Sequence, residues 1–282
     1  MEHSPTFVTI ATGYNSPEGP AVAANGNLYF VNWLSSAIVR IAADGVPREF
    51  ANTGGIPAGL AFHRDGALYC ADEGAHLHGV ITIDAQGVLT PFVDHYAGRP
   101  LNGANDLVFD RRGLLYFSDP WGSSGDHPIG AFYRAFPDGR LEQLDTGLAF
   151  PNGVALNADE SAVFLAETPR NHILRYPIAP DGAVGRPAVF ARLSGQPGPD
   201  GMAFDSAGCL YVAQHGAGRV VVLDQAGREV DTIAVPGRQP TNVAFGGPDF
   251  ASIIVTEVET AAVYRLDLGI PGQPLFGGPG QR

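Results

Sequence analysis

Short apolar runs, each bounded by turn-forming residues, recur along the whole chain and predict β-strands. Two such runs around a turn form a phrase that returns six times, and several of the central turns are Asn-Gly or Asp-Gly pairs that favour hairpins. The six phrases are Glu18–Asn32, Ala58–Asp72, Asn105–Asp119, Asn152–Glu167, Asp200–Gln214 and Thr241–Glu257. A second hairpin follows in most repeats, with turns such as Asp44-Gly45 and Asp138-Gly139. Each repeat therefore predicts four strands in about 40 to 48 residues, which is typical of one β-propeller blade.

Six repeats predict an all-β, six-bladed β-propeller with four antiparallel strands per blade, formed by residues 1–282 as a single domain. The sixth repeat has a third strand at Ala261–Leu268 but no clear fourth. Phe7–Ala11 is an apolar run that precedes the first phrase and lacks a partner of its own. We expect this N-terminal strand to complete blade six, because that pairing closes the ring and removes an exposed edge.

Composition excludes several classes of protein. The chain has 282 residues, 45% of them hydrophobic, which is ample for one large core, and no segment has the sustained period of a long helix. It carries 17 basic and 29 acidic residues, and without a basic cluster we expect no nucleic-acid partner. No run approaches the ~20 apolar residues of a membrane helix, and the N-terminus lacks the features of a signal peptide. The expectation is a cytoplasmic protein without a membrane partner; the sequence does not predict its oligomeric state.

The first residue of each phrase, here called the opener, varies in a chemically informative way. Four openers carry side-chain oxygens, namely Glu18, Asn105, Asn152 and Asp200. In a propeller the first strand of each blade lines the central channel, so we expect these four side chains to converge at one mouth. Two carboxylates and two carboxamides form a hard donor set that suits one divalent cation, with Ca²⁺ expected first and Mg²⁺, Mn²⁺ or Zn²⁺ as alternatives. The competing interpretation is that Asn and Asp only form turns here; against it, Ala58 and Thr241 occupy the equivalent positions in blades two and six.

Several motifs at blade spacing resemble those of the senescence marker protein/gluconolactonase family, which includes regucalcin. The motifs are Glu18-Gly19-Pro20, Leu101–Gly122, Pro151-Asn152-Gly153, Pro199–Met202 and Pro240-Thr241-Asn242. The resemblance covers nearly the whole chain and implies a six-bladed propeller that hydrolyses a lactone. It also implies that Glu18, Asn152 and Asp200 bind a divalent cation, with Asn105 at the same site as a ligand or a substrate contact.

In the implied reaction the cation polarises the ring carbonyl, and a carboxylate takes a proton from the attacking water. The resemblance favours Asp200 as this general base. Glu18 is the rival, although its longer side chain suits it better to anchoring the ion. One position departs from regucalcin: Gly103 stands where that protein has an arginine that contacts the sugar lactone. The Asp-Pro-Trp-Gly stretch Asp119–Gly122 instead resembles the bacterial gluconolactonase branch and implies a sugar-acid type of lactone.

Further substrate-binding candidates follow the second strands, which run back toward the same mouth. Trp33 and Trp121 would offer an aromatic wall for a sugar ring, with packing between blades as the alternative. His215 would lie at this mouth as a proton carrier or as an inert surface residue. Asp119 belongs to a set of polar residues that end the second strands, which either orient the ligands or simply meet solvent. Among them Asp119 is the preferred substrate contact, because the Trp121 loop follows it directly.

Two other functions remain open at this stage. One is a phosphotriesterase-type hydrolase on the same scaffold, as in the related diisopropyl fluorophosphatase with its oxygen-ligated calcium. The other is a binding propeller without chemistry, since the fold alone does not fix function.

Overall fold

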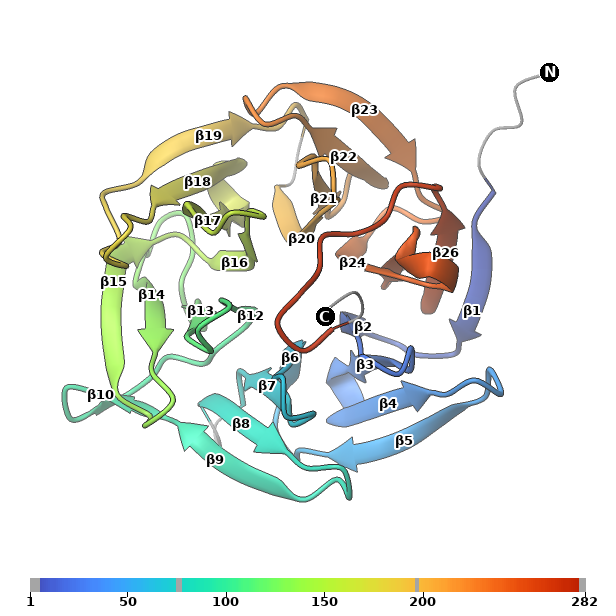
Figure 1. The fold of residues 1–282 in the computed structure, drawn as a ribbon, viewed down its shortest axis with the longest axis horizontal. Helices are drawn as coiled ribbons and strands as arrows, with labels where there is room; N and C mark the ends of the chain where they lie inside the picture. The colour runs from blue at the N-terminus through green and yellow to red at the C-terminus, as the bar shows by residue number, and fades with distance from the viewer. Residues whose placement is uncertain (1–5, 75–77, 196–197, 279–282) are drawn as a thin grey trace.

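The computed structural model describes residues 6–74, 78–195 and 198–278. Six four-stranded antiparallel sheets are arranged around a central axis as the blades of a β-propeller, which confirms the predicted fold class (Figure 1). In five of the sheets the strand order follows the chain from the axis outward, and in the sixth β24, β25 and β26 do so, so β2, β6, β12, β16, β20 and β24 are the innermost strands (Figure 1). The chain therefore places the start of every phrase beside the axis.

The strands of the six blades have the following bounds. Blade one contains β2 (Pro17–Val22), β3 (Leu28–Asn32), β4 (Ala37–Ile41) and β5 (Pro47–Asn52). Blade two contains β6 (Pro57–Phe62), β7 (Leu68–Asp72), β8 (Gly79–Ile83) and β9 (Leu89–Val93). Blade three contains β12 (Leu107–Phe109), β13 (Leu115–Asp119), β14 (Gly130–Ala135) and β15 (Leu141–Leu148). Blade four contains β16 (Pro151–Leu156), β17 (Ala162–Glu167), β18 (His172–Pro177) and β19 (Ala188–Arg192). Blade five contains β20 (Pro199–Phe204), β21 (Leu210–Gln214), β22 (Arg219–Leu223) and β23 (Glu229–Ala234).

Blade six is completed by the N-terminal strand, as predicted. It contains β24 (Pro240–Gly246), β25 (Ser252–Glu257), β26 (Ala262–Asp267) and β1 (Val8–Thr12). β1 pairs antiparallel with β26, with Val8 opposite Arg265 and Thr12 opposite Ala262. Side chains of β1 and β26 then pack against blade one, where Ala11, Val263 and Phe30 belong to one buried cluster. The two ends of the chain thus close the ring by pairing backbone and burying apolar surface together.

In the part of the chain that the structure describes, one hairpin and three 3₁₀ turns lie outside the blades. A two-stranded hairpin, β10 (His95–Tyr96) and β11 (Arg99–Pro100), occupies the long connection between blades two and three. Single 3₁₀ turns follow or precede strands at η1 (Trp33–Ser35), η2 (Thr168–Arg170) and η3 (Pro248–Phe250). Among the described residues no helix is long and apolar enough to cross a membrane.

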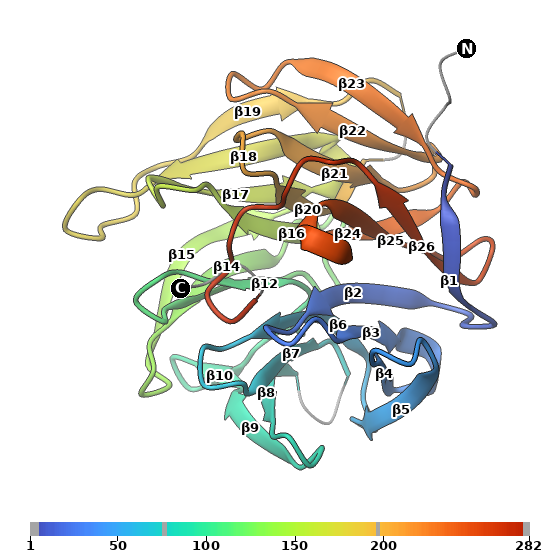
Figure 2. The ribbon, with the colours of Figure 1, turned by 45° about the vertical axis from the view of Figure 1, so that its right-hand side comes forward.

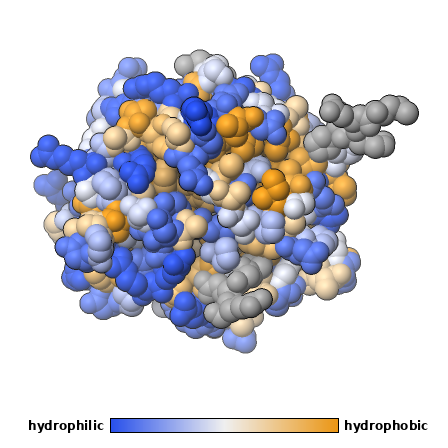
Figure 3. Space-filling model, turned by 45° about the horizontal axis from the view of Figure 1, so that its top comes forward, coloured by the Kyte–Doolittle hydropathy of each residue, from blue (hydrophilic) through white to orange (hydrophobic). Residues whose placement is uncertain are grey.

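The core lies between the blades. Alternating side chains of each sheet face the next sheet, so that buried clusters combine residues of neighbouring blades, as Val31 of β3 and Cys70 of β7 do in one of them. Exposed large hydrophobic side chains are scattered over the surface, and Figure 3 shows small hydrophobic groups among many hydrophilic ones on the face it displays. Such scattered exposure is ordinary for a folded domain.

The segment after β26 crosses the axis and closes one mouth of the channel (Figures 1 and 2). Its Gln273 donates from its backbone N–H to the carbonyl of Phe204 and from Nε2 to the carbonyl of Leu156, both at 3.0 Å. The ring of Phe276 packs against Phe109 and His63 with centroids 5.6 and 4.9 Å apart. These partners lie at or just after the C-terminal ends of inner strands. The opposite mouth, where the openers lie, is therefore the end of the channel that this segment leaves uncovered.

Removing the Phe276 ring tests how strongly this closing segment is held. Phe276 is 8% exposed, and Phe276→Ala should lower the free energy of unfolding by about 3 kcal/mol through lost burial and the cavity left behind. Urea denaturation followed by tryptophan fluorescence measures the change. Val230→Thr, at a site 56% exposed on β23, should change it by less than about 0.5 kcal/mol. Equal effects of the two substitutions would contradict the assigned role of Phe276.

Candidate active site

The four predicted ligand residues lie at the same end of the channel. Glu18, Asn152 and Asp200 sit at the second position of β2, β16 and β20, and Asn105 lies just before β12. The backbone carbonyl of Asn105 accepts a hydrogen bond of 2.6 Å from Gly59 N–H in the neighbouring blade, which fixes the height of blade three in the ring. The openers therefore approach the axis from blades one, three, four and five.

In blades one, two, four and five a glycine follows the opener. A Cβ atom at this position would collide with the next blade in each case: at Gly19 with Ala58, at Gly59 with Asn105 and Asp106, at Gly153 with Asp200, and at Gly201 with Asn242. The absence of a side chain lets neighbouring inner strands approach until their openers meet around the axis. Steric exclusion of a Cβ atom thus explains why glycine occupies this position in the repeated motifs.

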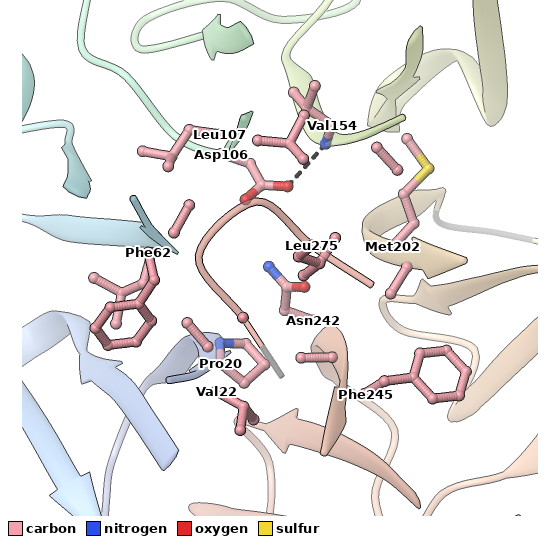
Figure 4. A pocket seen from close by; sticks show the side chains of 18 of the residues that line it. Pro20, Val22, Phe62, Asp106, Leu107, Val154, Met202, Asn242, Phe245 and Leu275 are labelled. Carbon is pink, nitrogen blue, oxygen red and sulfur yellow. Dashed lines mark hydrogen bonds between the residues drawn. The ribbon is translucent and has the colours of Figure 1, made fainter. Parts of the chain in front are cut away.

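In the two remaining blades the same position carries a polar side chain that bridges to the next blade. Asp106 Oδ2 accepts a hydrogen bond of 2.8 Å from the Val154 backbone N–H. Asn242 Nδ2 donates to Glu18 Oε2 at 3.2 Å. Both line an axial cavity of about 100 Å³ whose remaining walls are mostly apolar and whose far end is formed by the closing segment (Figure 4). These two residues link blade three to four and blade six to one, beneath the openers.

Three carboxyl groups share this small region. Burial raises the pKa of Glu18 well above its ordinary value, and the neighbouring carboxylates Asp200 and Asp106 raise it further, while hydrogen bonds from Asn242 and Gly19 lower it. Burial, followed by the charge of Asp106, likewise raises the pKa of Asp200, and a hydrogen bond from Asn152 opposes the shift. Burial raises the pKa of Asp106 itself to about 6. Like charges at close range in a poorly solvated site favour a bound cation or a bound proton.

The Asn152 side chain has an unused acceptor. Its amide hydrogen-bonds to Asp200, which leaves the carbonyl oxygen Oδ1 buried and without a hydrogen-bond partner among the described residues. A buried carbonyl without a partner is costly unless something else binds it. Together with the repelling carboxylates, this oxygen makes the donor set chemically suited to a hard cation.

Two of the four candidate cation ligands, Asn105 and Asn152, are carboxamides. In the part of the chain that the structure describes, His, Cys, Asp and Glu side chains alone form no group of three arranged to hold a metal. The openers differ from such a group because only Glu18 and Asp200 among them are carboxylates. Two carboxylates, two carboxamide oxygens and water suit Ca²⁺ or Mg²⁺ better than a soft metal.

His215 lies beside one of the carboxylates. Its Nδ1 is 3.9 Å from Asp200 Oδ2, and its side chain is 32% exposed. Burial lowers the pKa of His215, so that the imidazole is neutral at pH 7. A neutral, partly accessible imidazole next to Asp200 is in reach of a substrate or of water at the mouth.

Asp119, in contrast, is held below the surface. It is 1% exposed, and its two carboxylate oxygens accept the backbone N–H groups of Asn102 at 3.0 Å and Gly103 at 2.7 Å. Its contacts are therefore with the loop that leads to Asn105. This arrangement supports positioning of that loop, rather than the direct substrate contact expected from the sequence.

Four of the other five second-strand ends perform a similar task. Each of the following accepts a backbone N–H from the segment that enters the inner strand of its own blade: Asn32 from Ser16, Asp72 from Ile56, Glu167 from Ala149 and Glu257 from Gln239. Asp72, Glu167 and Glu257 are at most 1% exposed, so they do not meet solvent. Of the two interpretations left open by the sequence, the orienting role is the one these contacts support.

The backbone geometry at residue 103 explains why glycine, and not the arginine expected from regucalcin, occupies this position. Its backbone has φ = +142°, a conformation that favours glycine, and a Cβ would lie 2.8 Å from Trp121 Cβ and 2.9 Å from the Glu73 carbonyl oxygen. Trp121 is 38% exposed and its backbone N–H contacts the Gly103 carbonyl at 3.4 Å. Trp121 therefore occupies the space beside the loop, and no side chain can project from residue 103.

Glu73 is a site residue that the sequence reasoning missed. It comes one residue after the strand-end Asp72, is 3% exposed, and lies between Trp33 and Asn105. Trp33 Nε1 donates to Glu73 Oε2 at 3.3 Å, and Asn105 Nδ2 donates to Glu73 Oε1 at 2.9 Å. Burial raises the pKa of Glu73 to about 7, against the effect of these two hydrogen bonds. An acidic residue just after the strand end was the available signal, but the neighbouring Asp72 matched the repeat and concealed it.

Known proteins resemble this chain over most of its length. A 6-deoxy-6-sulfogluconolactonase from Pseudomonas putida is 32% identical, over 71% of this chain and 75% of that protein. A diisopropyl-fluorophosphatase from Loligo vulgaris is 28% identical, over 93% of this chain and 92% of that protein.

Solved structures agree with the fold. A gluconolactonase from Xanthomonas campestris superposes with a TM-score of 0.84 at 25% identity, covering 95% of this chain and 91% of that one. Regucalcin from Agrobacterium tumefaciens, described as a calcium-binding protein, gives a TM-score of 0.83 at 23% identity, over 99% and 98% of the two chains. A sequence model of the SMP-30/Gluconolactonase/LRE-like region matches residues 16–259. The chain therefore belongs to the SMP-30/gluconolactonase/LRE-like family.

Proposed function

We propose that this protein is a metal-dependent lactonase that opens the ring of a small lactone of the sugar-acid type. The observation that supports the proposal is that Glu18, Asn105, Asn152 and Asp200 lie at the start of inner strands on the uncovered side of the channel, where Glu18 and Asn152 both interact with Asp200. Membership of the family and the names of relatives such as the 6-deoxy-6-sulfogluconolactonase support lactone chemistry.

The same four residues would hold one divalent cation, with Ca²⁺ as the first candidate and Mg²⁺, Mn²⁺ or Zn²⁺ as alternatives. The unpartnered Asn152 Oδ1 and the mutual repulsion of Glu18 and Asp200 support this assignment. Calcium is also the ion named for the regucalcin structure. When bound, such a cation supplies Lewis acidity toward the lactone carbonyl and stabilises the negative charge that develops on it.

Asp200 is the residue we assign as general base. Its carboxylate lies beside His215, whereas Glu18 Oε2 is engaged by both Gly19 N–H and Asn242 Nδ2. Glu18 is thereby fixed in place, as suits an anchor. Asp200 would take the proton from the attacking water. A bound cation would keep this carboxylate ionised and so ready to accept that proton. His215 is available to pass that proton to solvent.

The rim offers aromatic and polar groups to the substrate. Trp33 and Trp121 project from the ends of the second strands of blades one and three and would flank a sugar ring, with Asn105 and His215 as polar contacts. Asp119 contributes through the loop that carries Gly103 and Asn105.

Substituting the proposed base and one proposed ligand tests the reaction. Asp200→Asn should reduce kcat for aldonolactone hydrolysis by at least about 100-fold, and Asn105→Ala by roughly 10- to 100-fold, because one removes the base and the other a ligand. EDTA should abolish turnover of the wild type and calcium should restore it. Glu229→Gln, on the outer strand β23, is the matched carboxylate-to-amide control and should leave kcat unchanged. Turnover that is indifferent to EDTA would contradict the metal dependence.

The same assay separates the competing functions. Resemblance to the squid diisopropyl-fluorophosphatase over 93% of this chain makes an organophosphate the appropriate second substrate. We expect hydrolysis of aldonolactones to exceed that of diisopropyl fluorophosphate. The reverse preference would favour the phosphotriesterase alternative, and failure with both classes would favour a binding propeller.

A further prediction follows from the raised pKa values. In the folded, metal-free protein the pKa is about 7 for Glu73 and about 6 for Asp106 and Asp119, so these groups keep protons that the unfolded chain releases at lower pH. Their contribution to the free energy of unfolding is complete below the unfolded pKa values and is lost as the pH rises through the folded values. Each unit of raised pKa corresponds to about 1.4 kcal/mol. In EDTA, the free energy of unfolding from urea titrations should therefore fall as pH rises from about 4 to about 7.

Calcium should reduce that fall, because a cation favours the ionised forms of Glu18 and Asp200. The matching measurement is the same pair of urea titrations with calcium in place of EDTA. A stability in EDTA that rises over this pH range would contradict the burial of these carboxyl groups. Equal slopes with and without calcium would argue against a cation at the openers.

A further inference from the structure

We infer that Glu73 is a positioning residue for the proposed lactonase reaction: it holds the Asn105 carboxamide with its oxygen directed away from Glu73 and toward the site. This inference rests on the proposed function, because it concerns how one of the four proposed ligands is presented. Glu73 itself is not a member of the ligand set and follows the second strand of blade two, whose own opener is Ala58.

The contacts of Glu73 join three blades. Its carboxylate receives Trp33 Nε1 from blade one at 3.3 Å and Asn105 Nδ2 from blade three at 2.9 Å. Each carboxylate oxygen therefore has its own donor. With 3% exposure, the group has little access to water in place of these donors.

Hydrogen-bond chemistry makes this arrangement directional. In the structure both Glu73 oxygens act as acceptors, one from the Trp33 indole N–H, which can only donate, and the other from Asn105 Nδ2. An asparagine side chain has a donating NH₂ and an accepting oxygen that are similar in shape, so its orientation is decided by its partners. Next to Glu73 the NH₂ of Asn105 faces the carboxyl group. Its Oδ1 is then left on the opposite side.

The backbone of Asn105 is fixed independently. Its N–H donates to the Ser118 carbonyl at 3.0 Å, and its carbonyl accepts from Gly59 N–H at 2.6 Å. Because both backbone groups of Asn105 are hydrogen-bonded, only the side-chain amide could still rotate. The hydrogen bond to Glu73 fixes the orientation of that amide. A ligand whose orientation is set beforehand binds its ion without the cost of ordering it.

Glu73 also touches the substrate side of the mouth. Its backbone lies against Gly103, where an added Cβ would be 2.9 Å from the Glu73 carbonyl oxygen and 2.8 Å from Trp121 Cβ. One residue thereby connects Trp33, the Gly103–Trp121 loop and Asn105. A purely structural role would be limited to these packing contacts and would not depend on which atom of Asn105 faces the axis.

The test is calcium binding by isothermal titration calorimetry, with kcat and KM for an aldonolactone measured alongside. Glu73→Gln keeps the shape but has one oxygen and one NH₂, so it cannot accept from Trp33 and Asn105 together. We expect calcium affinity and kcat to fall about 10-fold or more, with a smaller change in KM. Glu73→Ala should weaken calcium in the same way. Unchanged circular dichroism in EDTA verifies the fold of each variant.

A reversed pair provides the sharper measurement. In the double variant Glu73→Gln with Asn105→Asp, the amide of residue 73 can donate to the new carboxylate, and an oxygen again faces the site. Calcium should bind the double variant more tightly than either single variant, and the double-mutant cycle should give a favourable coupling. Trp33→Phe removes the other donor and leaves the Asn105 bond intact, so its calcium affinity should stay within about twofold of the wild type.

The outcomes are distinguishable. Wild-type calcium affinity and kcat retained in Glu73→Gln and Glu73→Ala would overturn the inference while leaving the proposed function in place. A double-mutant cycle without coupling between residues 73 and 105 would also overturn the inference. A role in packing alone does not depend on which of the two residues donates the hydrogen bond. A wild-type protein that neither binds calcium nor hydrolyses any lactone would overturn the proposed function and this inference together.

Discussion

The close approach of the six inner strands at one mouth of the channel is the constraint on which the rest of this structure depends. Four glycines that follow openers leave no space for a Cβ against the next blade. A side chain there would push the strands apart and widen the ring at the height of Glu18, Asn152 and Asp200. In the other two blades the position carries Asp106 and Asn242, which turn the same proximity into hydrogen bonds. Sterics and polar pairing together set the diameter of the mouth.

The narrow mouth concentrates negative charge. Burial raises the pKa of Glu18 and Asp200, and neighbouring carboxylates raise it further: Asp200 and Asp106 act on Glu18, and Asp106 acts on Asp200. A protein built only for stability would avoid such a group, because repelling or unpaired buried carboxylates lower the free energy of unfolding. Conflicts of this kind are expected where a site is built for binding, and the proposed divalent cation would relieve this one.

A second layer of carboxylates supports the first through the backbone. Asp72, Asp119, Glu167 and Glu257 are buried, but each accepts N–H groups from the segment entering an inner strand. Charge-assisted hydrogen bonds of this type are stronger than neutral ones and restrain the loops that carry the openers. Glu73 departs from this scheme because its partners are side chains, Trp33 and Asn105. The four carboxylates that bind backbone N–H groups therefore stabilise the loops at the mouth, whereas we infer that Glu73 orients a ligand side chain.

The repeat pattern determined the six blades, their strand count and the closure by the N-terminal strand, because short apolar runs and turn pairs are local signals with a fixed period. It also indicated the four openers, since variation at one position of a repeat stands out against the packing positions. Tertiary structure decided the rest. Whether Asp119 meets a substrate or holds a loop depends on which N–H groups face it, and no spacing encodes that. Glu73 acquires its contacts only because the consecutive blades one, two and three pack side by side around it, through contacts between residues about 30 to 40 positions apart that follow no local period.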